Sequence, residues 1–79
     1  MEIKILGPEC SRCRALAELV NQVLKENNIE GTVKKVKDIS DIMAYGIMLT
    51  PGLVINDKVK FSGGIPKRED ILKWIKEEQ

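Results

Sequence analysis

The pattern of apolar and polar positions begins with a strand and a long helix. Residues 1–6 (MEIKIL) alternate apolar and polar side chains, as a half-buried strand does, and Gly7-Pro8 closes the run. From there the period changes to that of an amphipathic helix, which we expect to begin near Cys10 or Ser11 and to end around Asn27-Asn28. The apolar stripe of this helix consists of Leu16, Leu19, Val20, Val23 and Leu24.

A second strand and a short helix follow. The strand, residues 32–36, combines β-branched residues with alternating lysines. Asp38 or Ser40 can cap a short helix that ends at Gly46. The apolar side chains of this helix are Ile39, Ile42 and Met43.

The remaining pattern predicts a hairpin and a final helix. The apolar run 53–55 reads as a buried strand, residues 56–57 (Asn-Asp) as a tight turn, and residues 59–61 as the return strand, which Gly63-Gly64 ends. Pro66 suits the first turn of the last helix, where its missing N–H is not needed. The packing face of this helix consists of Ile71, Leu72, Trp74 and Ile75.

The order β-α-β-α-β-β-α predicts an α/β fold. The first two strands are joined by a crossover helix, so they should run parallel with a right-handed connection. The hairpin then adds an antiparallel edge, and a mixed four-stranded sheet with helices on both faces is the expected architecture. We expect residues 1–79 to form a single domain, because 79 residues is short for more than one core.

Composition and charge exclude several classes of partner. The net charge is +1, and the 13 basic and 12 acidic residues are scattered along the chain, so we expect no nucleic-acid binding. Apolar stretches are far too short to span a membrane, and Met1 leads directly into a strand pattern without the charged and apolar regions of an export signal. We therefore expect a cytoplasmic protein that binds no membrane. We also expect a monomer, because nothing in the pattern resembles a large spare apolar face.

The two cysteines, Cys10 and Cys13, lie only three positions apart. A disulfide between them would close a very small loop, and such a crosslink contributes least to stability. Their spacing is therefore better explained by reactivity or metal binding than by structural stapling.

Their position between the first strand and the first helix favours thiol chemistry. Cys10 lies where unpaired backbone N–H groups and the helix dipole stabilise a thiolate, the nucleophile of disulfide exchange. Arg12 and Arg14 add positive charge, whereas Glu9 opposes it. Cys13 follows almost one turn later, so we expect Cys10 to attack a substrate disulfide and Cys13 to resolve the mixed disulfide.

A second signal is Thr50-Pro51, which lies directly before the buried strand. Proline cannot donate a hydrogen bond to the strand ladder, and a cis peptide bond at this position would be unusual and would indicate a specific structural role. With it, the whole chain resembles the small redox-active-disulfide branch of the thioredoxin superfamily, which is close to glutaredoxins in size. The matching segments are residues 3–7 leading into Cys-Ser-Arg-Cys at 10–13, residues 42–46 and 50–56, and the following hairpin and helix.

The resemblance implies a thioredoxin-like fold and a thiol–disulfide oxidoreductase. It implies that Pro51 is cis and lies against the disulfide, that Thr50 offers backbone hydrogen bonds to an extended substrate, and that Gly63 and Gly64 shape the substrate groove. Ser11 and Arg12, between the cysteines, complete the expected substrate contacts. No cofactor beyond the Cys10–Cys13 disulfide is implied, and the expected partners are disulfide-containing proteins or small thiols together with a thiol reductant or reductase.

The sequence departs from the family pattern at three places. Glu9 stands where thioredoxins usually have an aromatic residue, and Ser11-Arg12 replaces their Gly-Pro pair. Lys4 occupies the position of their buried acid; we expect its stem to be buried and its ammonium group to reach water. The tyrosine and glutathione contacts of glutaredoxins are not recognisable.

Two alternative functions remain open at this stage. Heavy-metal-associated domains also place CxxC between a first strand and a first helix, so a copper or zinc carrier is conceivable. Their element order ends in a strand, however, and Pro8 stands where they have methionine. The second alternative is a slow redox-sensing or adaptor module. We interpret Met43 and Met48 as core residues, and Tyr45 and Trp74 as packing residues.

Overall fold

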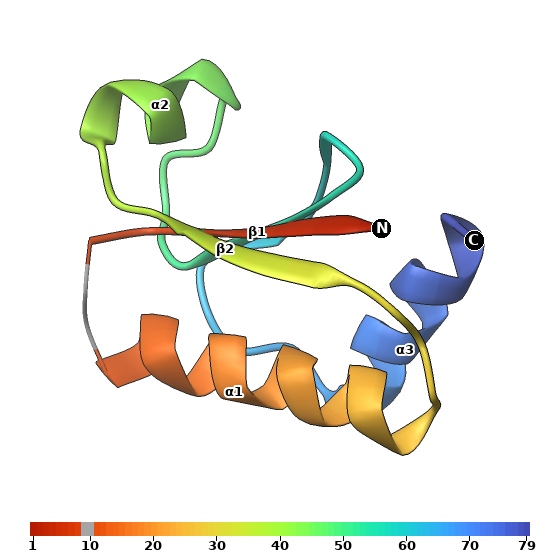
Figure 1. Cartoon of the computed structure of the whole chain (residues 1–79). Helices are drawn as coiled ribbons and strands as arrows, with labels where there is room; N and C mark the ends of the chain where they lie inside the picture. Colours follow the sequence, from red (N-terminus) through yellow and green to blue (C-terminus); the bar gives the residue numbers. More distant parts are fainter. Residues whose placement is uncertain (9–10) are drawn as a thin grey trace.

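A mixed four-stranded sheet separates two layers of helices in the computed structural model, which describes residues 1–8 and 11–79 (Figure 1). The elements in chain order are β1 (Glu2–Leu6), α1 (Ser11–Glu26), β2 (Thr32–Val36), α2 (Ile39–Ala44), β3 (Gly52–Ile55), β4 (Lys58–Ser62) and α3 (Arg68–Glu77). This is the predicted order, and the predicted α/β architecture is confirmed.

The strands lie in the order β2-β1-β3-β4. β1 runs parallel to β2 and antiparallel to β3, and β4 completes the hairpin at the edge. Ile3 pairs with Ile55 at one end of the β1–β3 ladder and Leu6 pairs with Gly52 at the other. The residues that follow β1 and those that precede β3 therefore meet at the same edge of the sheet.

The two faces of the sheet are covered unequally. α1 and α3 lie side by side under one face and form the larger core with the alternate strand residues Ile3, Ile5, Leu53 and Ile55 (Figure 1). The short helix α2 covers the other face through Ile42, which packs with Leu6 and Val54. Trp74 of α3 stacks on Phe61 of β4 with 5.8 Å between ring centroids, as expected for a packing residue.

The predicted turns and caps are largely as the sequence indicates. Asp38 caps α2 by accepting a hydrogen bond from the backbone N–H of Ser40. Asn56 and Asp57 both adopt positive φ, which gives the hairpin a tight two-residue turn. The prediction for Pro66 is wrong: α3 begins at Arg68 with Lys67 as its N-cap, so Pro66 precedes the helix.

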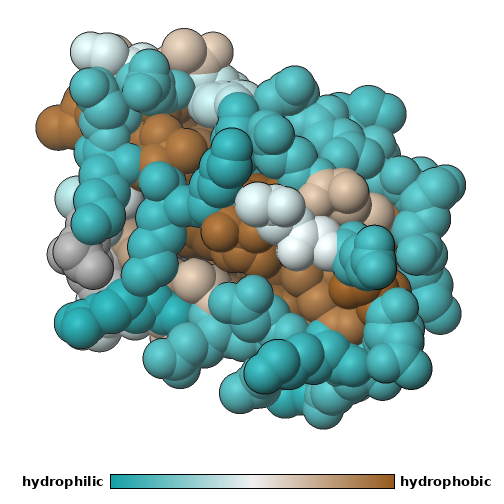
Figure 2. All heavy atoms as spheres, viewed as in Figure 1, coloured by the Kyte–Doolittle hydropathy of each residue, from teal (hydrophilic) through white to brown (hydrophobic). Residues whose placement is uncertain are grey.

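The interpretation of Met43 and Met48 as core residues is also wrong. Met43 is 67% exposed and Met48 is 95% exposed. α2 has only six residues, and of these only Ile42 is buried. Apolar atoms therefore reach the surface around α2, which Figure 2 shows at the upper left of the molecule.

None of the helices within residues 1–8 and 11–79 is both long and apolar enough to span a bilayer.

Candidate functional site

Three segments that are distant in sequence converge next to the start of α1. The Cβ that a side chain on Gly7 would carry lies 2.7 Å from Cys13 Sγ, 3.4 Å from Thr50 Cβ and 3.7 Å from Pro51 Cα. The chain can pass here only because Gly7 has no side chain. The structure thus brings Cys13 together with the Thr50-Pro51 pair at the edge of the sheet where β1 ends and β3 begins.

Cys13 is buried, with 3% of its surface exposed, in the first turn of α1. Ser11 and Arg12, between the two cysteine positions, are exposed. No acidic residue lies in the first turn of α1, and Arg12 and Arg14 add positive charge to the positive end of the helix dipole. Cys10, the predicted attacking thiol, and Glu9 lie outside the described residues.

The peptide bond between Thr50 and Pro51 is cis, and Pro51 is fully buried. The Pro51 carbonyl accepts a hydrogen bond from the Gly63 N–H at 3.0 Å. Gly63 has a φ of 89°, a backbone conformation that favours glycine, and a Cβ there would lie 3.1 Å from Leu49 Cδ1. The structure therefore places Gly63 directly beside Pro51.

Thr50 and Gly64 differ in what surrounds them. Thr50 is exposed, and within residues 1–8 and 11–79 its backbone forms no hydrogen bond with another backbone group. Such a backbone is available to pair with an extended chain. Gly64, also at positive φ, lies nearest to the ring of Phe61, so it borders β4.

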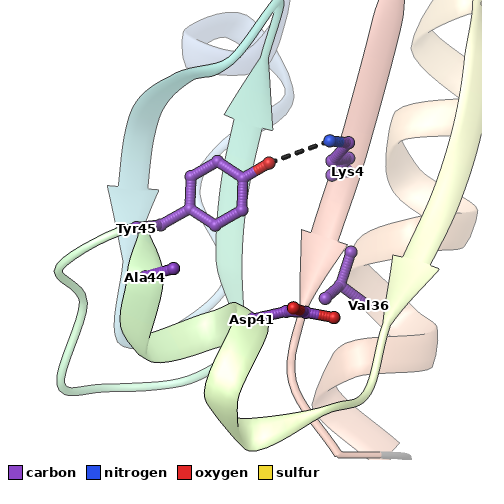
Figure 3. A pocket seen from close by; sticks show the side chains of 5 residues that line it. All are labelled: Lys4, Val36, Asp41, Ala44 and Tyr45. Atoms are coloured by element: carbon purple, nitrogen blue, oxygen red, sulfur yellow. Dashed lines mark hydrogen bonds between the residues drawn. The ribbon is translucent and has the colours of Figure 1, made fainter.

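Lys4 points away from the cysteine site. Its ammonium group donates a hydrogen bond to the Tyr45 hydroxyl at 2.8 Å (Figure 3). It also forms ion pairs with Glu2 at 3.2 Å and with Asp57 at 3.5 Å. Glu2 begins β1 and Asp57 lies in the β3–β4 turn, so this cluster is at the opposite end of β1 from Gly7. The hydrogen bond from Lys4 to Tyr45, and next the one to Glu2, raises the pKa of Lys4 above its ordinary value.

The Lys4–Tyr45 contact lies beside a pocket of about 420 Å³ between β1, β2 and α2 (Figure 3). Tyr45 ends α2, so the hydrogen bond ties the end of this helix to the sheet. Tyr45 is partly buried against the cluster of Leu6, Ile42 and Val54, and its role is the packing role that we expect for it.

No group of three or more histidine, cysteine, aspartate or glutamate side chains that could hold a metal ion occurs among the described residues. Cys10 lies outside them, so this finding concerns the rest of the chain.

Gly7 is the site residue that sequence reasoning missed. Its place before proline suggests only a turn. The contact to Cys13 is visible only when the three segments are folded together.

The fold and this convergence define a thioredoxin-like thiol–disulfide protein, and comparison with known sequences agrees. The family described as thioredoxin domain matches residues 1–76. A protein of Methanothermobacter thermautotrophicus named thioredoxin is 30% identical over 75 residues, which cover 95% of this chain and 97% of that protein. A thioredoxin of Methanocaldococcus jannaschii is 32% identical over 74 residues, covering 94% of this chain and 85% of that protein.

The chain belongs to the thioredoxin family and is a thiol–disulfide oxidoreductase of that family. The element order ends in α3, unlike that of heavy-metal-associated domains.

Proposed function

We propose that the chain exchanges a Cys10–Cys13 dithiol with the disulfides of protein or small-thiol substrates in the cytoplasm. The observation that carries the proposal is the packing of Cys13 Sγ against Gly7 beside the cis Thr50-Pro51 bond. We propose the cytoplasm because of the cysteine content. Small secreted proteins are dense in cysteines that form structural disulfides, whereas this chain has two cysteines three positions apart, which suits disulfide exchange in a reducing compartment.

The burial of Cys13 supports a division of labour between the two thiols. A thiol that is 3% exposed cannot approach the disulfide of a folded or bulky substrate. It can react with a neighbouring sulfur inside the protein. We therefore assign the first attack to Cys10 and the resolving attack to Cys13.

The exchange proceeds in two displacements. The Cys10 thiolate attacks one sulfur of the substrate disulfide, which forms a mixed disulfide and releases the other substrate sulfur as a thiolate. The Cys13 thiol then loses its proton and attacks Cys10 Sγ. This breaks the mixed disulfide, forms the Cys10–Cys13 disulfide and releases the second substrate thiol. The substrate gains two electrons and two protons, and a thiol reductant or reductase restores the dithiol.

The surroundings of Cys13 supply the substrate contacts. The Thr50 backbone pairs with an extended substrate segment, with Pro51 and Gly63 beneath it and Gly64 at its border. Ser11 and Arg12 are exposed on the first turn of α1 and can contact the substrate from the other side. The hydrogen bond from Gly63 to Pro51 supports this arrangement because it holds the two sides of the proposed groove together.

A redox titration of the purified protein against dithiothreitol, read by thiol alkylation, tests this function. The proposal predicts one two-electron couple in the range of thioredoxins to glutaredoxins, roughly −270 to −200 mV. A protein without a reversible couple that instead retains Cu(I) or Zn(II) in its reduced form would be a metal carrier. Rapid oxidation of the reduced protein by insulin would distinguish an exchange enzyme from a slow redox sensor with the same couple.

A further inference from the structure

Two basic segments flank the residues that contact Gly7. Cys13 Sγ packs against Gly7, and the Val36 carbonyl accepts a hydrogen bond from the Gly7 N–H at 2.8 Å. The residues directly before and after Cys13 and Val36 are all basic and exposed, namely Arg12, Arg14, Lys35 and Lys37. We call these four residues the basic corner. The fold thus gathers charges that are scattered along the sequence beside the cysteine site.

The basic corner lies at one end of the sheet. The start of α1 and the end of β2 are on the same side of the molecule, at the left of Figure 1. Val36 pairs with Leu6, the last residue of β1, and Lys35 pairs with Ile5. Ile5 belongs to the core that α1 and α3 cover, so Lys35 projects from that same face of the sheet. Lys35 and the first turn of α1 therefore share both a face and an end of the sheet.

Three of the four cations of the basic corner are unpaired. Among residues 1–8 and 11–79, Arg12, Arg14 and Lys35 form no ion pair. By contrast, a glutamate pairs with each of four other cations, which are Lys4, Lys58, Lys60 and Arg68. The acids that adjoin the basic corner in the sequence are Glu9 and Asp38, and the Asp38 carboxylate caps α2. Two acids against four cations leave an excess of positive charge.

This excess favours a partner that carries several negative charges. Because the four cations adjoin residues that contact Gly7, their fields add in front of the cysteine site. Such a field raises the rate of association with an acidic surface and has little effect on a neutral one. Nucleic acids and anionic membranes are also negatively charged, but they contain no disulfide for the thiols to attack. A protein with carboxylates around a disulfide matches both the charge of the basic corner and the chemistry of the cysteines.

We propose that the basic corner recruits acidic proteins, so that the chain reacts preferentially with disulfides flanked by aspartate or glutamate. This inference rests on the proposed function, because the Cys10 thiolate performs the attack. The cations act on the encounter and not on the bond exchange, so the preference depends on ionic strength. It also depends on where the cations lie and not on the net charge of the chain, which is only +1.

Two peptides with one cysteine each, linked as a mixed disulfide to thionitrobenzoate, test the proposal. Aspartates flank the cysteine in one peptide, and asparagines of the same shape flank it in the other. The Cys10 thiolate of the reduced protein forms a disulfide with the peptide and releases thionitrobenzoate, the better leaving group, which is measured by its absorbance. Each rate is divided by the rate of the same peptide with 2-mercaptoethanol, because the aspartates also change the reactivity of the peptide itself.

We expect the wild-type protein to prefer the aspartate peptide by roughly tenfold at an ionic strength of about 0.1 M and to lose this preference at about 1 M. The reason is that the screening length falls from about 10 Å to about 3 Å between these conditions. The double variant Arg14→Gln/Lys35→Gln removes half of the cations of the basic corner. It should reduce the preference to roughly threefold at the lower ionic strength.

Lys25→Gln/Lys76→Gln is the matched control, because it removes the same amount of charge at the other end of the molecule. Lys25 lies about 18 Å from Cys13 along α1. Lys76 lies in the last turn of α3, whose C-cap Glu78 accepts a hydrogen bond from Asn56 in the β3–β4 turn. Charges this far from the site are screened at about 0.1 M ionic strength, so the control should keep the full preference.

Equal normalised rates for the two peptides in the wild-type protein, a preference that persists at the higher ionic strength, or the same loss in both double variants would overturn the proposal and leave disulfide exchange intact. Failure of the wild-type protein to release thionitrobenzoate from either peptide would instead overturn the proposed function. Binding of duplex DNA or of anionic lipid vesicles that is lost in the Arg14→Gln/Lys35→Gln variant would assign the basic corner to a different class of partner, and this too would contradict the proposal.

Discussion

Cys13 Sγ occupies the space that a side chain on Gly7 would need, since a Cβ at position 7 would lie 2.7 Å from the sulfur. Gly7 is buried and has no positive φ, so the reason for glycine here is room for the sulfur and not backbone conformation. This relationship links the end of β1 to the first turn of α1 and sets where the Cys13 thiol lies.

Gly7→Ala should therefore destabilise the protein. The added methyl group forces either Cys13 or the backbone of the Thr50-Pro51 loop to move, and overpacking of this kind costs about 1–3 kcal/mol. Urea unfolding measures the change. Gly31→Ala is the matched control, because a Cβ there makes only an ordinary contact of 3.4 Å with Leu24, and its effect should stay within about 0.5 kcal/mol. Equal stability of Gly7→Ala and wild type would contradict the packing described.

Lys4→Met should leave the rate of exchange with hydroxyethyl disulfide unchanged within about twofold. The Lys4 ammonium group is held by Tyr45, Glu2 and Asp57 at the end of β1 opposite to Gly7, too far along the strand to stabilise a thiolate. Because the pKa of Lys4 lies above its ordinary value of 10.5, Lys4 keeps its charge at any pH suited to the assay. A tenfold change in rate would show instead that Lys4 acts on the cysteines.

Glu78→Gln should lower the stability at neutral pH and lose this effect in acid. The Lys60 ammonium group, 2.9 Å from Glu78, and then that of Lys58 hold the pKa of the Glu78 carboxyl below its ordinary value of 4.5. A lowered pKa stabilises the folded state above pH 4.5, and the contribution disappears as the pH falls through the folded value. Urea unfolding of the variant and the wild type should thus differ near pH 7 and converge near pH 2. A difference that is the same at both pH values would show that the ion pairs are not its cause.

The fold follows closely from the sequence because each element has a local signal. The helical spacing of Leu16 to Leu24 gives α1, and the short apolar run at 53–55 gives a strand that is buried along its whole length. Asp38 caps α2 with its own side chain, and Asn56-Asp57 form the hairpin turn with their own backbone. Both effects are local, so they can be predicted from the sequence without knowing the tertiary contacts.

The surface around α2 was harder to predict. Periodicity marks Ile39, Ile42 and Met43 alike as apolar, but a six-residue helix on one face of a sheet buries only Ile42. Which apolar residues project past the sheet depends on where the helix is anchored. The packing of Ile42 and the contact between Tyr45 and Lys4 are two of its anchors. The convergence of Gly7, Cys13 and Pro51 likewise depends on the pairing of β1 with β3, which no local pattern encodes.

Trapping of mixed disulfides tests the central claim most directly, namely that Cys10 attacks and the buried Cys13 resolves. The Cys13→Ser and Cys10→Ser variants are each reduced, mixed with insulin, quenched by acid and analysed by mass spectrometry. The account predicts a stable mixed disulfide through Cys10 in the Cys13→Ser protein, and little or none in the Cys10→Ser protein, whose remaining thiol is buried. Trapping by the Cys10→Ser protein alone, or equal trapping by both variants, would contradict it.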